Sequence, residues 1–513
     1  MEGRINIHLN PTSLSQFIRL ENCERFLRFR LVPEDLKRLQ KKWNLTIQPL
    51  TPLLKESGAD FEENIAKEIA VRGETVIDLT DKDTSETIRC FQSIKYPTIL
   101  YQPSLEAPIG NFLCSGRGDI IRVSRDSQKR LVLLVADIKA TRKEKTEHRV
   151  QVATYVKMIQ QIATSNQIPL AEIKGSILTQ QDDGSFPFLQ ADTPTFDLDT
   201  YLTIVDRLVV LPESIVNRIV SQPFEAAFYH LNYKCDGCLY NSICMYDAAE
   251  KLDVTLTPLI SAVEKRVLNE AGVCTIQDLA SLMDFPPEKQ YEMRPSPAHL
   301  KTLNVLNNRW PVAPELPFLV QRAKAALHNF DKTSDYRSYL LSSGFGTLPS
   351  EVQYPDLIKI FFDAQRDYLQ DRLYLISAHV IGPRGEKTIV CCSNQPPNDE
   401  IEGGLLHDWV RQVIGALRQV AARDEAPIHL YCYNRYDQKI LLEALKRHLS
   451  EVAAMPAFYD LMTQSPALTQ PIISFLSDEV QERLNIGRVC TPLHDVARWL
   501  RFDWKDDKYD YFQ

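Results

Sequence analysis

Two apolar, β-branched runs that flank a short polar segment constrain the fold of this chain more than any other feature of its sequence. The first run, FLCSGRGDIIRV, lies in residues 112–124, and the second, RLVLLVADIKA, covers residues 130–140. Such side chains suit the pleated, half-buried surface of a sheet, and a polar segment as short as SRDSQK between two strands is typical of a hairpin. The sequence therefore predicts a β-hairpin inside a buried sheet.

Helical and extended patterns alternate on both sides of this hairpin, which is typical of an α/β protein. Apolar residues recur at helical spacing over much of residues 11–75. Further elements are expected after the hairpin: helices over residues 146–163, 198–230, 405–422 and 437–449, two short helices within 253–285, and strands in GSILTQ, LIKIFFDA, LYLISAHVI, KTIVCC and PIHLYCY. A second α/β pattern thus begins near residue 355.

Length and composition limit the classes of protein to which the chain can belong. A chain of 513 residues has room for about three domains, and its 44% hydrophobic and 25% charged residues are ordinary for a globular protein. No apolar run approaches the roughly 20 residues needed to span a bilayer, and the N-terminus lacks the apolar segment of a secretory signal. The sequence therefore predicts a cytoplasmic protein without a membrane partner.

The net charge of −8 argues against a basic nucleic-acid coat protein, whose affinity comes from many phosphate contacts. It does not exclude a nuclease, because an active site made of carboxylates adds negative charge itself. A local basic stretch would suit contacts with phosphates, although a solvated helix start is the more frequent explanation of such a run. This basic stretch consists of Lys139, Arg142, Lys143, Lys145, His148 and Arg149.

Three charged residues of the predicted hairpin form a candidate catalytic site. Side chains two apart on a strand share one face, so Asp137 and Lys139 project together, and Asp119 on the paired strand completes a carboxylate pocket. Two carboxylates suit a hard divalent cation such as Mg²⁺ or Mn²⁺, which hydrolysis of a phosphodiester needs to activate water and to neutralise the growing charge. Lys139 would orient the attacking water. In the alternative, both aspartates are turn or edge residues of an inert sheet.

The helix that follows the hairpin carries two further candidate residues. Gln151 and Tyr155 lie at positions i and i+4, so one helical face presents both toward the strand that carries Lys139.

Four of the eleven cysteines have a spacing that suits a metal centre. Cytosolic thiols stay reduced, so clustered cysteines in such a protein are better explained as metal ligands than as disulfides. Cys235, Cys238 and Cys244 lie close together, and Cys23 is distant in sequence but can complete a four-thiolate site. Zinc and an iron–sulfur cluster both accept four thiolates, so the spacing alone leaves the metal open.

The order GRGD, then D-I-K, then Q-x-x-x-Y resembles the RecB-like PD-(D/E)XK nucleases. The resemblance implies a restriction-endonuclease-like fold in which Asp119, Asp137 and the backbone carbonyl of Ile138 bind metal. It further implies that Lys139 is catalytic and that Gln151 and Tyr155 support it. These nucleases also carry a Gly-x-x-His-Glu-like motif on an earlier helix, for which Gly58 and Glu62 are suitably placed in GADFEE. Phe61 stands where the histidine is usual, which puts that metal ligand in doubt.

The same resemblance favours a 4Fe–4S cluster over zinc. One cysteine before the nuclease motifs and three after them is the arrangement of the iron–sulfur RecB-like nucleases. The cluster would be bound by Cys23, Cys235, Cys238 and Cys244, and its role would be structural, since it joins the two ends of the domain.

The rest of the chain resembles the modules that follow such nuclease domains in a bacterial RecB-like family. Residues 253–285 resemble a helix-hairpin-helix, and the C-terminal part resembles an RNase H-like domain. Active exonucleases of that fold begin their carboxylate set with Asp-x-Glu on the first strand, whereas this chain has Asp363 and Gln365; Asp437 and Asp495 occupy two further candidate positions. Because the amide of Gln365 is a poorer ligand for two cations, the C-terminal domain is expected to be inactive.

Three domains are therefore expected: an iron–sulfur nuclease domain at 1–250, a helical connector at 251–320 and an RNase H-like domain at 321–513. The expected function is metal-dependent hydrolysis of DNA, with single strands or ends as substrate, in DNA repair or antiviral defence. The chain lacks a P-loop, so a superfamily 1 helicase would be a separate partner. The alternative is a DNA-binding scaffold whose nuclease site is weakened by Phe61 and which recruits the helicase.

Overall fold

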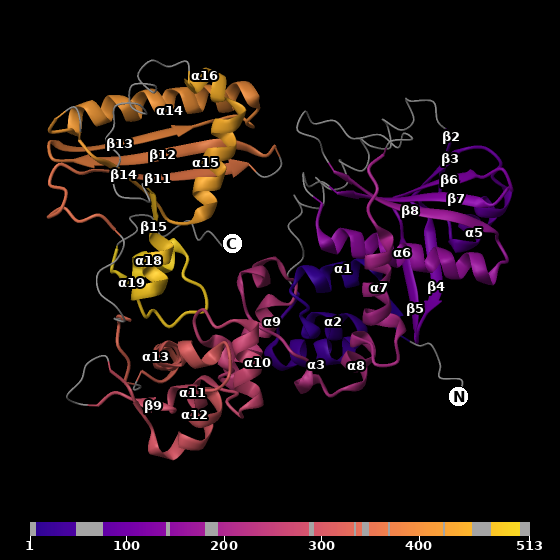
Figure 1. Ribbon diagram of the computed structural model, residues 1–513, viewed down its shortest axis with the longest axis horizontal. Helices are drawn as coiled ribbons and strands as arrows, with labels where there is room; N and C mark the ends of the chain where they lie inside the picture. The colour runs from indigo at the N-terminus through magenta and orange to yellow at the C-terminus, as the bar shows by residue number, and fades with distance from the viewer. Residues whose placement is uncertain are drawn as a thin grey trace. The chain divides into compact units, whose positions relative to one another are not determined.

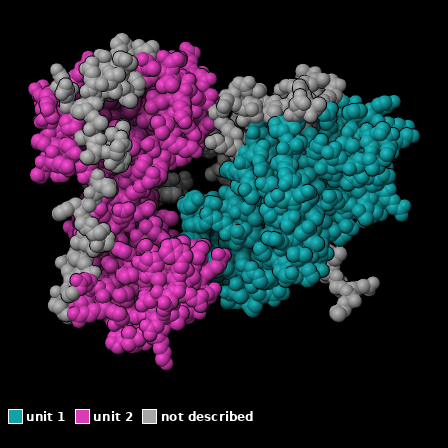
Figure 2. Space-filling view, viewed as in Figure 1, with its two compact units in different colours: residues 1–250 teal, residues 251–513 magenta. Residues whose placement is uncertain are grey.

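The structure is a computed structural model, and the chain in it divides into two compact units, residues 1–250 and residues 251–513 (Figure 2). It describes residues 7–47, 75–139, 144–179, 193–286, 292–332, 335–340, 348–367, 370–423, 426–453 and 473–502. Both units combine helices with sheets that contain parallel and antiparallel strands, so the α/β class expected from the sequence is confirmed. Within these ranges no helix is both long enough and apolar enough to cross a membrane.

Three short helices open unit 1: α1 (Pro11–Arg19), α2 (Glu24–Leu31) and α3 (Pro33–Trp43). The first begins where the side chain of Asn10 accepts a hydrogen bond from the backbone N–H of Thr12 at 2.7 Å. The third begins at a proline, whose missing N–H is not needed in a first turn, and ends at Asn44 in the left-handed conformation. The helical character expected from residue 11 onward is therefore confirmed through residue 43.

The larger sheet of unit 1 has five strands in the order β2-β3-β6-β7-β8. Its strands are β2 (Thr75–Asp78), β3 (Thr98–Tyr101), β6 (Ile120–Arg125), β7 (Leu131–Lys139) and β8 (Leu170–Thr179). The β6 and β7 strands pair antiparallel, and β7 pairs parallel with β8. The expected hairpin is therefore present, but its first strand begins only at residue 120.

The run at residues 112–124 forms two strands instead of the one that was expected. Residues Phe112–Arg117 form β5, which pairs with β4 (Ser104–Ile109) and β1 (His8–Leu9) in a separate three-stranded sheet. Gly110 closes the tight β4–β5 turn with a positive φ of 57°, which glycine adopts without strain. The Gly-Asn pair at residues 110–111 is itself typical of a hairpin turn. It indicates that the residues after it, at the start of the run, belong to a hairpin other than β6–β7.

The 20-residue helix α6 (Thr146–Ser165) packs against the strands that carry the candidate catalytic residues. In Figure 1 it lies along the five-stranded sheet, and it contacts β4, β7, β8, α1 and α7 (Leu198–Val205). Unit 1 is completed by α5 (Thr84–Ser93), a π-helical segment (Asp206–Val210), α8 (Ile215–Ser221), 3₁₀ turns at Phe224–Ala226 and Tyr233–Gly237, and α9 (Asn241–Lys251).

The first part of unit 2 is helical and has its own apolar core. It contains α10 (Ala262–Glu270), α11 (Ile276–Ala280), α12 (Leu300–Leu306) and α13 (Val312–Asp331), with a 3₁₀ turn at Val254–Leu256, another at Pro297–His299, and the short paired strands β9 (Met283–Asp284) and β10 (Arg294–Pro295). The α10 and α11 helices are the two expected within residues 253–285. Because α13 continues through residues 320 and 321, the boundary expected there lies inside a helix.

The second part of unit 2 is built on a five-stranded sheet in the order β13-β12-β11-β14-β15. The strands are β11 (Ile358–Asp367), β12 (Arg372–Gly382), β13 (Gly385–Cys392), β14 (Ile428–Cys432) and β15 (Ile473–Phe475). The first three form an antiparallel meander, and the last two add in parallel. The helices α14 (Asp399–Val420), α15 (Arg435–Arg447) and α16 (Leu449–Ala453) lie around the sheet, whereas α18 (Leu476–Arg483) and α19 (Leu493–Trp499) lie between the sheet and α13 (Figure 1).

Candidate functional site

The structure brings Asp119, Asp137 and Lys139 together at one end of the β6–β7 hairpin. Asp119 immediately precedes β6, whose first residue Ile120 pairs with Ala136, so Asp119 lies beside the last residues of β7. One carboxylate oxygen of Asp119, Oδ2, accepts a hydrogen bond of 2.7 Å from the backbone N–H of Ile138. The ammonium of Lys139 lies 2.7 Å from Oδ2 of Asp137. The two carboxylates therefore share a small site with one ammonium group.

The register of the hairpin also fixes where the Ile138 carbonyl points. The N–H and C=O of one strand residue point to the same side, as in a pair that exchanges both hydrogen bonds. The Ile138 N–H points toward Asp119, on the side where β6 has already ended. Its carbonyl oxygen therefore faces the carboxylate site, and its side chain packs into an apolar cluster with Ile99 and Ile120.

Gln151 and Tyr155 of α6 approach the same site. The Gln151 side chain donates a hydrogen bond of 3.2 Å from Nε2 to Oδ1 of Asp137. The Tyr155 hydroxyl donates to the backbone carbonyl of Arg117 at 2.7 Å, just before the segment that carries Asp119. A side chain at Gly116 would come within 3.2 Å of the Tyr155 ring, so a glycine allows this close approach. Tyr155 thus supports the position of the Asp119 segment.

The electrostatics of the site are compatible with a bound cation. Asp137 is 1% exposed, and burial raises the pKa of Asp119 well above its usual range, an effect that the charge of Asp137 increases. The ammonium of Lys139 offsets this only in part. Burial and the charges of both aspartates also raise the pKa of the Tyr155 hydroxyl. Two like charges held out of water are stabilised when a divalent cation joins them, so the donor set fits such an ion.

Substitution of Asp119 by asparagine is expected to raise the melting temperature of the metal-free protein at neutral pH. A carboxyl whose pKa is raised by folding contributes stability that is complete below the unfolded pKa and is lost as the pH rises through the folded pKa. The amide avoids this loss and still accepts the Ile138 hydrogen bond. For a unit of this size each kcal/mol corresponds to roughly 2–4 °C. Calorimetry in EDTA measures the shift, and a lower melting temperature would contradict the unfavourable burial of the charge.

Several other residues expected at the site lie outside the residues that the structure describes. Gly58, Phe61 and Glu62 are outside them, so the position of Glu62 relative to the aspartates is not part of the geometry above. The same holds for Arg142 and Lys143 of the basic stretch.

In its described part, the basic stretch does not form the continuous phosphate-binding surface that its sequence suggested. The guanidinium of Arg149 pairs with Glu144 at 2.7 Å and donates to the Tyr201 hydroxyl at 3.0 Å, so its charge is already compensated. His148 is buried, whereas Lys145 is exposed. Neighbours on successive helix positions face different sides, which separates these charges in space.

The four cysteines singled out by their spacing line one pocket in unit 1. Cys23 precedes α2, Cys235 and Cys238 lie in and just after the 3₁₀ turn at Tyr233–Gly237, and Cys244 is on α9. Burial raises the pKa of the Cys23 thiol to about 12, and the negative charges of Cys238 and Cys235 raise it further. Burial also raises the pKa of the Cys244 thiol, and the charges of Cys23, Cys238 and Cys235 raise it further. The four thiols therefore share one pocket, but within the described residues no three of their sulfur atoms all lie within 4.8 Å of one another.

A buried ion pair holds the two sides of this cysteine pocket together. The Arg25 guanidinium on α2 donates to the Asp247 carboxylate on α9 at 2.6 Å, and both side chains are almost fully buried. The guanidinium also lies over the Tyr229 ring, 3.4 Å from its centroid. Near it, Glu24 accepts hydrogen bonds from Arg218 and from the backbone N–H of Phe228. The protein chain alone therefore brings residue 23 to residues 235–244.

Two carboxylates of the expected C-terminal site lie near each other, but both have structural partners. The Asp363 side chain accepts hydrogen bonds of 3.1 Å from the amide of Gln365, and Asp437 accepts one from the backbone N–H of Asn434 in the capping box of α15. Burial, followed by the charge of Asp363, raises the pKa of Asp437 to about 6. Asp495 pairs with Arg488 at 2.8 Å. The amide of Gln365 thus occupies the face on which a second carboxylate would be needed.

Substitution of Asp363 by alanine is therefore expected to leave metal-dependent cleavage unchanged, because the expected activity belongs to unit 1. The measurement compares the wild type, Asp363→Ala, Lys139→Ala and the double variant on the same DNA. If Lys139→Ala retains substantial cleavage that the added Asp363→Ala removes, the C-terminal domain is itself a nuclease.

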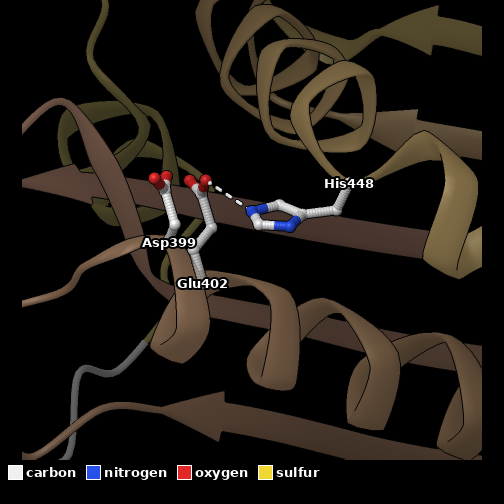
Figure 3. Close-up of side chains that lie close together, drawn as sticks. All are labelled: Asp399, Glu402 and His448. Carbon is white, nitrogen blue, oxygen red and sulfur yellow. Dashed lines mark hydrogen bonds and ion pairs between the residues drawn. The ribbon is translucent and has the colours of Figure 1, made fainter. Parts of the chain in front are cut away.

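Asp399, Glu402 and His448 form another compact group in unit 2, and Figure 3 shows their side chains turned toward one another. Glu402 is 0% exposed and accepts two hydrogen bonds from the Arg447 guanidinium, at 2.7 and 2.6 Å. Asp399 accepts one of 2.7 Å from Arg372. Guanidinium groups neutralise both carboxylates, so this group is a buried ion-pair network that joins α14, β12 and the end of α15 and leaves no charge for a metal ion to balance.

Comparisons with known proteins identify no family for this chain. A scan against protein-family models gives no match, and a search of curated proteins gives none either. Among solved structures, the chain is similar to one described as "Crystal structure of SSO0001", with 15% sequence identity and a TM-score of 0.24, over 47% of this chain and 88% of that chain. So distant a likeness supports no conclusion, and the function is inferred from the chain's own residues.

Proposed function

We propose that this protein is a divalent-metal-dependent DNA nuclease, a phosphodiester hydrolase that acts on single strands or DNA ends. The single observation that supports the proposal most is the buried pair of Asp119 and Asp137, next to the ammonium of Lys139 and joined to α6 through Gln151. Two buried carboxylates that share a single ammonium are only partly compensated, and a divalent ion bound between them would complete the balance of charge.

The residues present fit a hard divalent cation. Asp119, Asp137 and the carbonyl of Ile138 would hold Mg²⁺ or Mn²⁺, since all three offer oxygen ligands on the same side of the hairpin. The bound ion would supply an activated water and charge neutralisation. Lys139 would orient that water and offset the charge that grows on the phosphate, and the Gln151 amide would hold Asp137 in place.

The cysteine pocket is proposed to bind a 4Fe–4S cluster. Four thiols that come from both ends of unit 1 and line one pocket fit a centre that binds them as thiolates. Zinc fits the same donor set, and absorbance with metal analysis decides between the two. The cluster would be structural, because its four ligands come from both ends of unit 1, which the Arg25–Asp247 pair also joins.

The resemblance of the sequence motifs extends the proposal to the fold and the partners. Unit 1 is proposed to be a RecB-like PD-(D/E)XK domain, residues 251–320 a helical connector, and the remainder an inactive RNase H-like domain. An antiparallel meander that continues into two parallel strands is compatible with the latter. A cytoplasmic role in DNA repair or antiviral defence with a separate superfamily 1 helicase follows from the resemblance alone.

A cleavage assay tests the proposed function directly. The anaerobically purified full chain is incubated with end-labelled single-stranded, duplex and flapped DNA in Mg²⁺, Mn²⁺ or EDTA. Cleavage that requires the metal is the expected result. DNA binding without cleavage in either metal would reject the nuclease and favour a scaffold that recruits a helicase.

A further inference from the structure

His148 lies at the candidate site as a buried imidazole with an unused ring nitrogen. It is in the first turn of α6, on the face that also presents Gln151 and Tyr155, because positions i, i+3 and i+7 share one side of a helix. Its exposed fraction is 8%, and within the ranges that the structure describes its Nδ1 has no hydrogen-bond partner. A buried polar atom without a partner is unfavourable in a folded protein, so its presence at a site calls for an explanation.

The Lys139 ammonium is the strongest charge acting on this ring. Burial, followed by the charge of Lys139, lowers the pKa of His148 to about 4, and the nearby Glu147, Lys145 and Glu144 have smaller effects. The imidazole is therefore neutral at neutral pH. In the tautomer that carries its proton on Nε2, Nδ1 is a hydrogen-bond acceptor. His148 thus offers an acceptor nitrogen, and the Lys139 ammonium, whose charge acts on the ring, can donate three hydrogen bonds.

Binding of a divalent cation would change the surroundings of Lys139. In the structure its ammonium lies 2.7 Å from Oδ2 of Asp137. A cation bound by the same carboxylate competes for that oxygen and repels the ammonium, because the two positive charges are close together in a partly buried site. An acceptor that is not itself a ligand of the cation would then hold the ammonium in place. A neutral nitrogen meets this need without cancelling the charge of Lys139.

We propose that His148 is a positioning residue for Lys139, and that its Nδ1 accepts a hydrogen bond from the ammonium when a divalent cation occupies the two aspartates. The inference rests on the proposed nuclease function and deepens it by adding a residue that acts through Lys139. The hydrogen bond would hold the ammonium at the position from which it reaches the scissile phosphate. A shift of about 1 Å in such a group lowers a rate by roughly 100-fold.

Two variants of His148 and one control test this role in cleavage. His148→Phe keeps a planar ring but removes the acceptor, and it is expected to lower kcat by about 100-fold with little change in KM, since Lys139 is misplaced only for the chemical step. His148→Asn returns an amide oxygen near the place of Nδ1 and is expected to recover most of the loss. Thr154→Val is the matched control, because Thr154 is equally buried on α6 but bonds only within its own helix. Rescue by asparagine would not follow from a merely structural role.

A second measurement reads the hydrogen bond without any cleavage. In protein labelled with ¹⁵N-histidine, Ca²⁺ is added to occupy the aspartates, and the Nδ1 resonance of His148 is identified by its loss in His148→Asn. An upfield shift of this resonance that is absent in Lys139→Ala is the expected result. An Nδ1 resonance that does not respond to Ca²⁺, together with wild-type kinetics of His148→Phe, would overturn the inference.

The two measurements separate this inference from the proposed function. If the wild type cleaves DNA and Lys139→Ala does not, but the Nδ1 resonance of His148 does not respond to Ca²⁺, the nuclease function is supported and the role of His148 is rejected. If no DNA is cleaved but Nδ1 shifts with Ca²⁺ in a manner that requires Lys139, the role of His148 stands and the nuclease function is rejected.

Discussion

Replacement of Lys139 by alanine is expected to lower the rate of metal-dependent cleavage by about 100-fold to 1,000-fold, which is the usual cost of losing one group that stabilises transition-state charge. Lys139 is the ammonium beside Asp137, and its side chain is 24% exposed, so it can reach a bound phosphate while it faces the metal site. The loss should fall on kcat, because the charge that the ammonium offsets grows only during reaction.

Two controls make the Lys139 experiment specific. Lys145→Ala removes an exposed ammonium from the same region and is expected to cleave at the wild-type rate. Since removal of Lys139 also takes a partner from the buried Asp137, melting temperature and DNA affinity are measured in Ca²⁺ beside the rate. Full turnover by Lys139→Ala would remove this site from consideration.

The second large effect is expected from Cys235→Ser, which should abolish the iron–sulfur cluster and destabilise unit 1. The wild type purified without oxygen should be brown, with broad absorbance near about 400 nm, because thiolates bind the iron. Serine is a poor ligand for iron, and the binding energy of the centre is part of the folding energy, so a lower melting temperature should accompany the loss of colour.

Cys274→Ser is the matched control for the cluster, because Cys274 is exposed and lies outside the cysteine pocket. It should keep both colour and stability. A colourless wild type with one zinc ion per chain would replace the cluster by a zinc site, and a colourless wild type without metal would contradict a metal centre in the pocket.

The part of the site that depends on the local chain could be predicted from the sequence. Side chains alternate along a strand with a period of two, which was enough to place Asp137 and Lys139 together and to direct Ile138 into the core. The approach of Gln151 and Tyr155 to one side of the site could be predicted in the same way, because a helix places positions i and i+4 on one face.

What the sequence did not predict depends on contacts between distant segments. The run at residues 112–124 was read as one strand, but its first half forms β5 in a second sheet, where it pairs with β4 and with the distant β1. His148 and Arg149 were read as one basic stretch, although tertiary packing buries the first and pairs the second with Glu144. The spacing of three between His148 and Gln151 was the only local signal that His148 faces the site.

The pairing of α2 with α9 has a consequence for how the protein is made. The contact between Arg25 and Asp247 spans 222 positions of the chain, and the cysteine pocket likewise joins residue 23 to residues 235–244. At a ribosomal rate of about 5–20 residues per second, α2 is synthesised roughly 10–45 s before its partner emerges. Throughout this interval Arg25 and Cys23 have no α9 to contact, so neither the ion pair nor a four-thiolate centre can form on the nascent chain. The four-thiolate centre proposed above could assemble only after Cys244 has been synthesised, and the Arg25–Asp247 pair only after residue 247.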